Sequence, residues 1–237
     1  MLIENCYRPF MSVSTKDRVL RAAAELLADG GRDAVSTRAV SAAAGIQAPT
    51  LYRLFGDKDG LLDAVAAHGF AEYLERKNQL AATDDPVADL RSGWDLHVEF
   101  GLSRPAFYVL MFGEPGRVTE AGRLAAERLT EIVTRVADAG RLRMSVARAV
   151  ALSHATCVGV TMALIAADEP DLEISAIARE SMLATITTDE PATPGSDALA
   201  SRAVALRTAL PPAGEIPLSP AEHALLTEWL DRLADAR

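Results

Sequence analysis

Hydrophobic and polar positions recur with the period of an α-helix along most of this chain. The first clear segment has one apolar face, made of Val19, Ala23, Leu26 and Leu27. It is predicted to run from about Lys16 to Ala28, because Ser14 and Asp17 form a capping pattern and Gly30-Gly31 is a stop signal. Strands would need β-branched runs of alternating polarity, and the sequence shows no convincing one.

Ten further helices follow from capping residues, glycines and prolines. They are expected at residues 37–44, 48–55, 57–79, 87–102, 105–112, 118–139, 145–167, 171–187, 198–209 and 220–236. The chain would then comprise a tail (1–14), a compact unit (15–65), a connecting helix (66–81) and a helical bundle (82–237). We therefore predict an all-α protein with a small N-terminal unit and a larger C-terminal bundle.

One predicted helix contains a stretch long enough to cross a membrane. Residues 149–167 carry no formal charge. The stretch contains Ser153, His154, Thr156 and Thr161. Arg148 and Asp168 flank it, and it has no aromatic belt. We expect a helix surrounded by protein rather than a membrane span.

Composition indicates the cellular setting. The 237 residues are 49% hydrophobic and 24% charged, which is typical of a folded globular protein. Two cysteines, Cys6 and Cys157, cannot build a disulfide framework, and the N-terminus lacks a signal-peptide run. We therefore expect a cytoplasmic protein. The sequence leaves open whether Met1 or Met11 is the native start.

The net charge of −9 is unevenly distributed. Residues 1–80 hold ten Lys/Arg and ten Asp/Glu, whereas residues 81–237 hold fourteen and twenty-three. An acidic surface repels nucleic acid, so the acidic C-terminal part is poorly suited to that partner. The two parts of the chain are expected to have different partners.

The N-terminal unit contains a helix-turn-helix pattern. Thr37–Ala44 and Ala48–Phe55 are joined by Gly45-Ile46-Gln47, and Gly45 permits the left-handed backbone that a tight turn needs. The second helix is expected to expose Gln47, Ala48, Pro49, Thr50, Tyr52 and Arg53. Small residues at its start allow close approach to a major groove, and the polar ones suit phosphate oxygens and base edges.

Lys58 is a separate indication of anion binding. It lies in the first turn of the next helix, where the helix dipole disfavours a cation by about 0.3–1 kcal/mol. A phosphate bound there would reverse that preference. The alternative is a solvated lysine offset by Asp57 and Asp59.

The string from Thr37 to Leu62 closely resembles the N-terminal domain of TetR-family transcriptional regulators. Its most specific part reads Thr50-Leu51-Tyr52-x-x-Phe55-x-x-Lys58-Asp59-x-Leu61. The resemblance covers about residues 15–65, and the segment 104–113 is a weaker match to some C-terminal domains of the family. It implies an all-helical homodimer that represses transcription until a small molecule binds the C-terminal domain.

Site residues carry over from this resemblance by position. Thr37 and Arg38 open the first helix of the motif, and Lys58 binds phosphate. The residues facing DNA are Gln47, Ala48, Pro49, Thr50, Tyr52 and Arg53. Leu54 departs from the His or Tyr common in the family, and Gln47 from the common Ser. A glutamine there can pair with adenine.

The family's usual dimer interface uses two C-terminal helices of each subunit. The matching candidates are residues 145–167 and 220–236. The second has an apolar stripe of Leu225, Leu226, Trp229, Leu230 and Leu233. The alternative is that this stripe docks within its own subunit.

An effector cavity is expected between helices of the C-terminal bundle. Its walls would be Trp94, Phe107, Met111 and Cys157, and its orienting contacts His97, Arg128, His154 and Thr161. The alternative is an ordinary core. His154 and Cys157 are too few to hold a metal ion, so no metal site or cofactor is predicted.

Enzymatic motifs are absent from the sequence, including phosphate loops, nucleophile elbows and paired metal-binding histidines. We therefore predict a regulator that binds a palindromic operator in double-stranded DNA, a small-molecule effector and a second copy of itself, without catalytic residues. The alternative is a helical assembly protein whose helix-turn-helix packs or binds other proteins.

Overall fold

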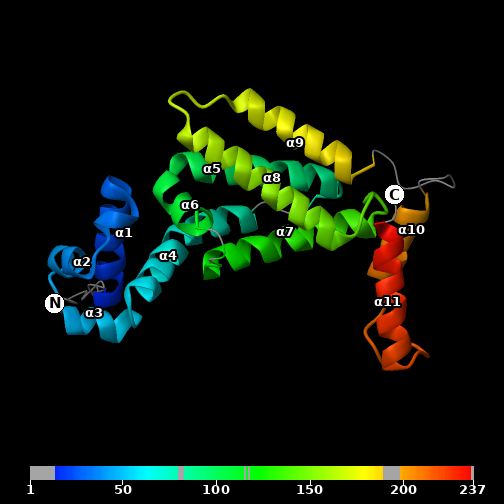
Figure 1. Cartoon of the computed structure of the whole chain (residues 1–237), viewed down its shortest axis with the longest axis horizontal. Coiled ribbons are helices and arrows are strands. Elements are labelled where there is room, and N and C mark those ends of the chain that lie inside the picture. Colours follow the sequence, from blue (N-terminus) through cyan, green and yellow to red (C-terminus); the bar gives the residue numbers. More distant parts are fainter. Residues whose placement is uncertain (1–13, 80–82, 115, 117, 189–197, 236–237) are drawn as a thin grey trace, which may run out of the picture. The chain divides into compact units, whose positions relative to one another are not determined.

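The computed structural model describes residues 14–79, 83–114, 116, 118–188 and 198–235. Over these ranges the chain forms eleven α-helices and no β-strand, which confirms the all-α prediction (Figure 1). It divides into two compact units, one ending at Gly69 and the other beginning at Phe70. The predicted tail lies outside the described residues except for Ser14.

The N-terminal unit consists of three helices and the first half of a fourth. These are α1 (Thr15–Ala34), α2 (Thr37–Ala44), α3 (Ala48–Phe55) and α4 (Lys58–Gln79), which continues into the second unit. Ser14 caps α1 by accepting the Asp17 N–H, as its capping pattern predicts. The regular helix is interrupted at Gly30-Gly31, where Gly31 has a φ of 64°. Fully buried side chains from all four helices form the core, among them Val19, Leu27, Val40, Leu51, Leu61 and Val65.

The C-terminal unit contains the remaining helices. These are α5 (Pro86–Ser103), α6 (Pro105–Phe112), α7 (Glu120–Asp138), α8 (Val146–Ala166), α9 (Leu172–Ile186), α10 (Ala198–Ala209) and α11 (Pro220–Ala234). Helix α5 packs against α6, α7, α8 and α9, while α8 lies along α9. Helices α10 and α11 form a separate hairpin that packs on α7 (Figure 1).

Gly101 lets α5 approach its neighbours closely. A Cβ atom at this position would lie 2.2 Å from the Thr161 Cγ2 of α8 and 3.1 Å from a ring carbon of Tyr108 on α6. Because real atoms do not approach so closely, a larger residue would force the helices apart.

Helix α8 is only partly covered by its own chain. Among the described helices it is the one long and apolar enough to span a membrane, yet 28% of its most apolar stretch is buried. Its exposed face carries the small residues Ala151, Ala155, Gly159 and Ala163. The expectation that protein surrounds this helix is therefore not met within a single chain.

Candidate DNA-binding surface and effector cavity

Helices α2 and α3 are joined by the turn that the sequence predicts. The Ser36 side chain caps α2 by accepting the Ala39 N–H at 3.1 Å. Gly45 then adopts left-handed angles, with φ 63° and ψ 40°, and its N–H donates to the Ala42 carbonyl. Half-buried Ile46 closes the turn by donating its N–H to the Ser41 carbonyl at 3.0 Å. Local chemistry therefore sets the direction in which α3 leaves α2.

Helix α3 has one buried face and one exposed face. Leu51 is fully buried, and Leu54 and Phe55 are half-buried. The residues that the structure leaves exposed at the opposite face are Gln47, Ala48, Pro49, Tyr52 and Arg53. Thr50 is half-buried, so its expected exposure is only partial. Tyr52 keeps 49% of its surface exposed, so its ring and hydroxyl are accessible to a partner.

The first turn of α2 adds two residues to this unit's polar surface. Thr37 is half-buried and Arg38 is exposed. Both follow directly after the Ser36 cap, so they lie at the N-terminal end of the helix. This end carries the partial positive charge of the helix dipole, which favours an approaching anion.

Lys58 opens α4, and the neighbouring carboxylates are engaged elsewhere. The Asp57 carboxylate accepts the Gly60 N–H at 2.7 Å, and Asp59 forms an ion pair with Arg32 at 3.6 Å. Lys58 itself is exposed. Lys58 therefore presents its ammonium at the N-terminus of α4, a position suited to a phosphate. The two neighbouring carboxylates keep their negative charge, so the solvated-lysine alternative stays open.

Gly60 is a site residue that sequence reasoning missed. A Cβ atom there would lie 2.1 Å from the Phe55 carbonyl oxygen. Glycine thus allows the end of α3 to meet the first turn of α4, and this contact places Lys58 beside α3. A glycine three residues after the Asp57 cap was the available signal.

A small cavity lies inside the C-terminal bundle. Its volume is about 40 Å³, and four of the predicted residues line it, namely Trp94, His97, His154 and Cys157. The remaining lining residues are Leu90, Gly93, Ala125, Leu129, Ile132, Ser153 and Met182. Several of these neighbour predicted residues on the same helices, so the helical stripes were the signal that could have found them.

The other four predicted cavity residues do not line this space. Phe107, Met111 and Thr161 are buried in the surrounding packing. Arg128 forms an ion pair with Glu131 on α7, and its side chain is 37% exposed. The predicted orienting role of Arg128 therefore has no support in this conformation, because the next-turn carboxylate holds its guanidinium.

Polar groups in and around the cavity are mostly satisfied. The Trp94 Nε1–H donates to Ser175 Oγ at 3.0 Å, and a 2.7 Å hydrogen bond joins His97 Nε2 to the Tyr108 hydroxyl. Burial lowers the pKa of His154 below its usual value of 6.5. The cavity thus holds a neutral imidazole among apolar walls, a combination suited to a mainly apolar ligand.

An aromatic cluster connects this cavity to α4. The Tyr73 ring on α4 lies 6.4 Å from the His97 ring and 4.8 Å from the Phe100 ring. Tyr108 extends the cluster, with its ring 5.2 Å from that of His97. Since His97 lines the cavity, a displacement there would reach α4 through a single ring contact.

Comparison with known proteins identifies the N-terminal unit. Residues 19–65 match the sequence profile of bacterial regulatory proteins, tetR family. The match covers the turn, the exposed face of α3 and Lys58. No protein of curated function matches the sequence significantly.

Solved structures extend the similarity to most of the chain. A protein of unknown function from Rhodococcus sp. RHA1 aligns with a TM-score of 0.62 and 25% identity, over 76% of this chain and 100% of the other. A single-substitution variant of TetR from Acinetobacter baumannii AYE, in complex with minocycline, aligns with a TM-score of 0.54 and 26% identity, over 70% and 93%. RolR, in complex with resorcinol, aligns with a TM-score of 0.59 and 22% identity, over 81% and 92%.

Proposed function

Because this chain belongs to the TetR family of transcriptional regulators and binds specific DNA sequences, we propose that it is a homodimeric repressor. A small-molecule effector releases it from a palindromic operator in the cytoplasm. The observation that carries the proposal is the exposed face of α3, held against a fixed turn with the cation of Lys58 beside it. No catalytic residue, metal or cofactor enters the proposal.

The DNA-binding surface divides into reading and anchoring groups. Helix α3 enters the major groove, where Ala48 and Pro49 permit close approach and Gln47 pairs with adenine. Tyr52, Arg53 and Lys58 bind phosphate oxygens. Thr37, Arg38 and Thr50 contact the DNA backbone beside these phosphates. The near-neutral charge of this part of the chain permits the approach that the acidic C-terminal part would oppose.

The dimer forms through α8 and α9. The exposed small-residue face of α8 lies beside a helix whose Leu172, Ile174 and Ile177 are each more than half exposed. We propose this surface in place of the pairing of residues 145–167 with 220–236 that the sequence suggested. Helix α11 packs chiefly along α10 and buries Leu230 and Ala234 in its own chain, while Leu225, Trp229 and Leu233 of its stripe stay exposed.

The effector binds in the cavity between α5, α7, α8 and α9, and it must enlarge that cavity. A volume of about 40 Å³ holds about one water molecule, whereas ligand sites usually enclose about 300–1,000 Å³. The closed cavity therefore corresponds to the effector-free state. Opening the cavity displaces His97, which contacts Tyr73 on α4. The TetR neighbour solved in complex with minocycline supports a small molecule as the occupant.

Selection from a random duplex library tests the DNA-binding function. We expect a palindrome whose half-sites lie about one helical turn, or about 34–36 Å, apart or slightly more. Lys58→Ala should weaken binding to all sequences and reduce the salt slope by about 1. Arg202→Ala, at an exposed position of α10, is the matched control and should change neither.

The outcomes separate the two candidate functions. An unchanged salt slope in the Lys58 variant would remove the phosphate assignment. If the selection enriches no DNA sequence and the binding of DNA does not depend on salt, the alternative of a helical assembly protein is favoured.

A further inference from the structure

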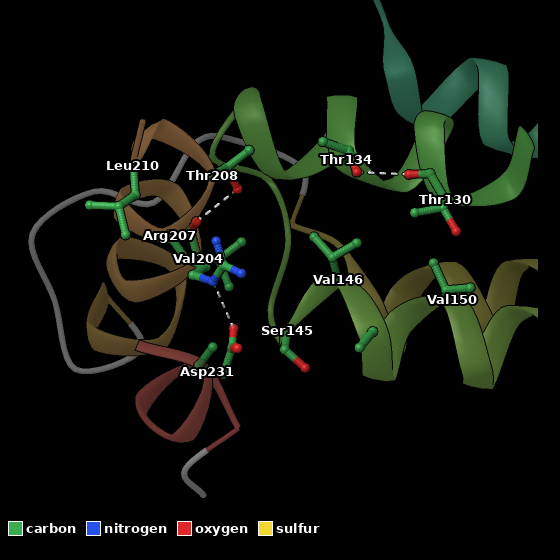
Figure 2. Close-up of a pocket in the computed structure, with 12 residues that line it drawn as sticks. Thr130, Thr134, Ser145, Val146, Val150, Val204, Arg207, Thr208, Leu210 and Asp231 are labelled. Atoms are coloured by element: carbon green, nitrogen blue, oxygen red, sulfur yellow. Dashed lines mark hydrogen bonds and ion pairs between the residues drawn. The ribbon is translucent and has the colours of Figure 1, made fainter. Parts of the chain in front are cut away.

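A second, larger cavity lies where the α10–α11 hairpin meets α7 and α8. Its volume is about 540 Å³, within the range of ligand sites. Figure 2 shows the residues around it. They come from α7, the start of α8, α10 and α11. It shares no residue with the effector cavity.

Arg207 is the cationic group of this cavity, and its side chain is 40% exposed. Its side chain points toward Asp231 across the space between α10 and α11 (Figure 2). The Nε to Oδ1 distance is 3.5 Å, beyond the 2.9 Å or so of a charge-assisted hydrogen bond. Within the described part of the chain, the buried Nε makes no hydrogen bond. A buried donor without an acceptor indicates a missing partner.

The other polar groups of the cavity do not supply that partner. The hydroxyls of Thr130, Thr134 and Thr208 each donate to a carbonyl of the preceding turn. Ser145 donates its hydroxyl to Asp235 at 3.0 Å. The cavity therefore offers the Arg207 guanidinium, which is held by the 3.5 Å ion pair with Asp231 but whose Nε makes no hydrogen bond, together with the apolar side chains of Val146, Val150 and Val204.

We propose that this cavity binds a small carboxylate with an apolar body. The carboxylate accepts hydrogen bonds from Arg207, whose planar fork of donors matches it in a bidentate pair. Asp231, which is half exposed, turns toward solvent when the ligand arrives. The apolar body packs on the valines. Bound there, the ligand joins the α10–α11 hairpin to α7 and α8.

Isothermal titration of the full-length protein with octanoate tests this site. Octanoate should bind saturably, whereas octylamine, with the same chain and the opposite charge, should not. Arg207→Met should weaken octanoate binding by about tenfold or more, because a hydrogen bond to a charged group is lost. Arg202→Met removes the same charge from an exposed position of the same helix and should leave binding unchanged.

A second variant keeps Arg207 and fills the cavity. Val150→Phe should abolish octanoate binding by occupying the space of the apolar body, and circular dichroism would check that each variant is folded. The proposal is overturned if octanoate does not bind, if octylamine binds equally well, or if Arg207→Met and Arg202→Met behave alike. If Arg207→Met does not fold, unchanged binding by Val150→Phe overturns it. No DNA is present, so these outcomes are independent of operator binding.

Discussion

Individual side chains determine which groups of this protein remain free to act. At the start of α4, Asp57 caps the helix through a backbone N–H and Asp59 pairs with Arg32, while Lys58 is exposed. In the bundle, Glu131 holds Arg128 away from the cavity that the sequence assigned to it. Sequence separation hides the pairing of Asp59 with Arg32, because the two residues lie on different helices and spacing alone does not reveal their contact.

His154 should make stability sensitive to mild acid. Burial lowers its pKa, so below the usual value of 6.5 the unfolded chain takes up a proton that the folded chain resists. Stability from this group is therefore complete above pH 6.5 and is lost as pH falls toward the lowered pKa. We expect the urea unfolding free energy to fall between pH 7.5 and pH 5.5, and to fall less in His154→Gln.

The shifted pKa of Glu180 does not affect the window between pH 7.5 and pH 5.5. Hydrogen bonds from Arg91 and Arg179 lower the pKa of Glu180 to about 2, so its contribution is lost only in stronger acid. If the unfolding free energy of the wild type and of His154→Gln changes equally with pH between pH 7.5 and 5.5, His154 is not the source of the acid sensitivity.

At the scale of elements, the sequence located the helices well because their boundaries are set locally. Ser14, Ser36, Asp57 and Ser219 each cap a helix through a hydrogen bond within three residues. The faces of long apolar helices were harder to assign. The uncharged stretch of α8 suggested a fully enclosed helix, yet only the folded chain shows which side α5 and α9 cover.

The exposed face of α8 yields a direct test of the dimer interface. A Cβ atom at Gly159 would meet no atom from another part of its own chain within 4 Å, and the position is exposed, so Gly159→Arg should leave the subunit folded. Its charge would be buried without a partner in an α8–α9 interface, so we expect monomers in analytical ultracentrifugation and much weaker operator binding.

Trp229→Glu on α11 is the comparison for that variant. Trp229 is 52% exposed on the helix that the sequence suggested for the interface. We expect this variant to remain dimeric. A monomeric Trp229→Glu together with a dimeric Gly159→Arg would assign the interface to α11 instead.

At the scale of the whole molecule, two units of different charge are joined by one continuous helix. The sequence predicted a neutral N-terminal part, an acidic C-terminal part and a continuous helix at 57–79 between them. In the structure, α4 spans the boundary between the two units. The sequence did not show which aromatic rings of the C-terminal unit pack against Tyr73 of that helix. The contact is made by rings from separate segments, Tyr73 with His97 and Phe100, and these meet only after the bundle has packed.

This ring contact predicts a variant that binds both ligands but no longer links them. Thermal-shift screening of metabolites first identifies an effector. Tyr73 does not line the effector cavity, so Tyr73→Leu should bind that effector with an affinity within a few fold of the wild type. Its effector-free operator affinity should also persist. The effector-induced loss of operator affinity, typically about 5–150-fold in allosteric proteins, should shrink toward none. Phe107→Leu, another buried aromatic but outside the ring cluster, should retain the full response. Fluorescence anisotropy of labelled operator measures both variants, and a normal response from Tyr73→Leu would place the coupling elsewhere.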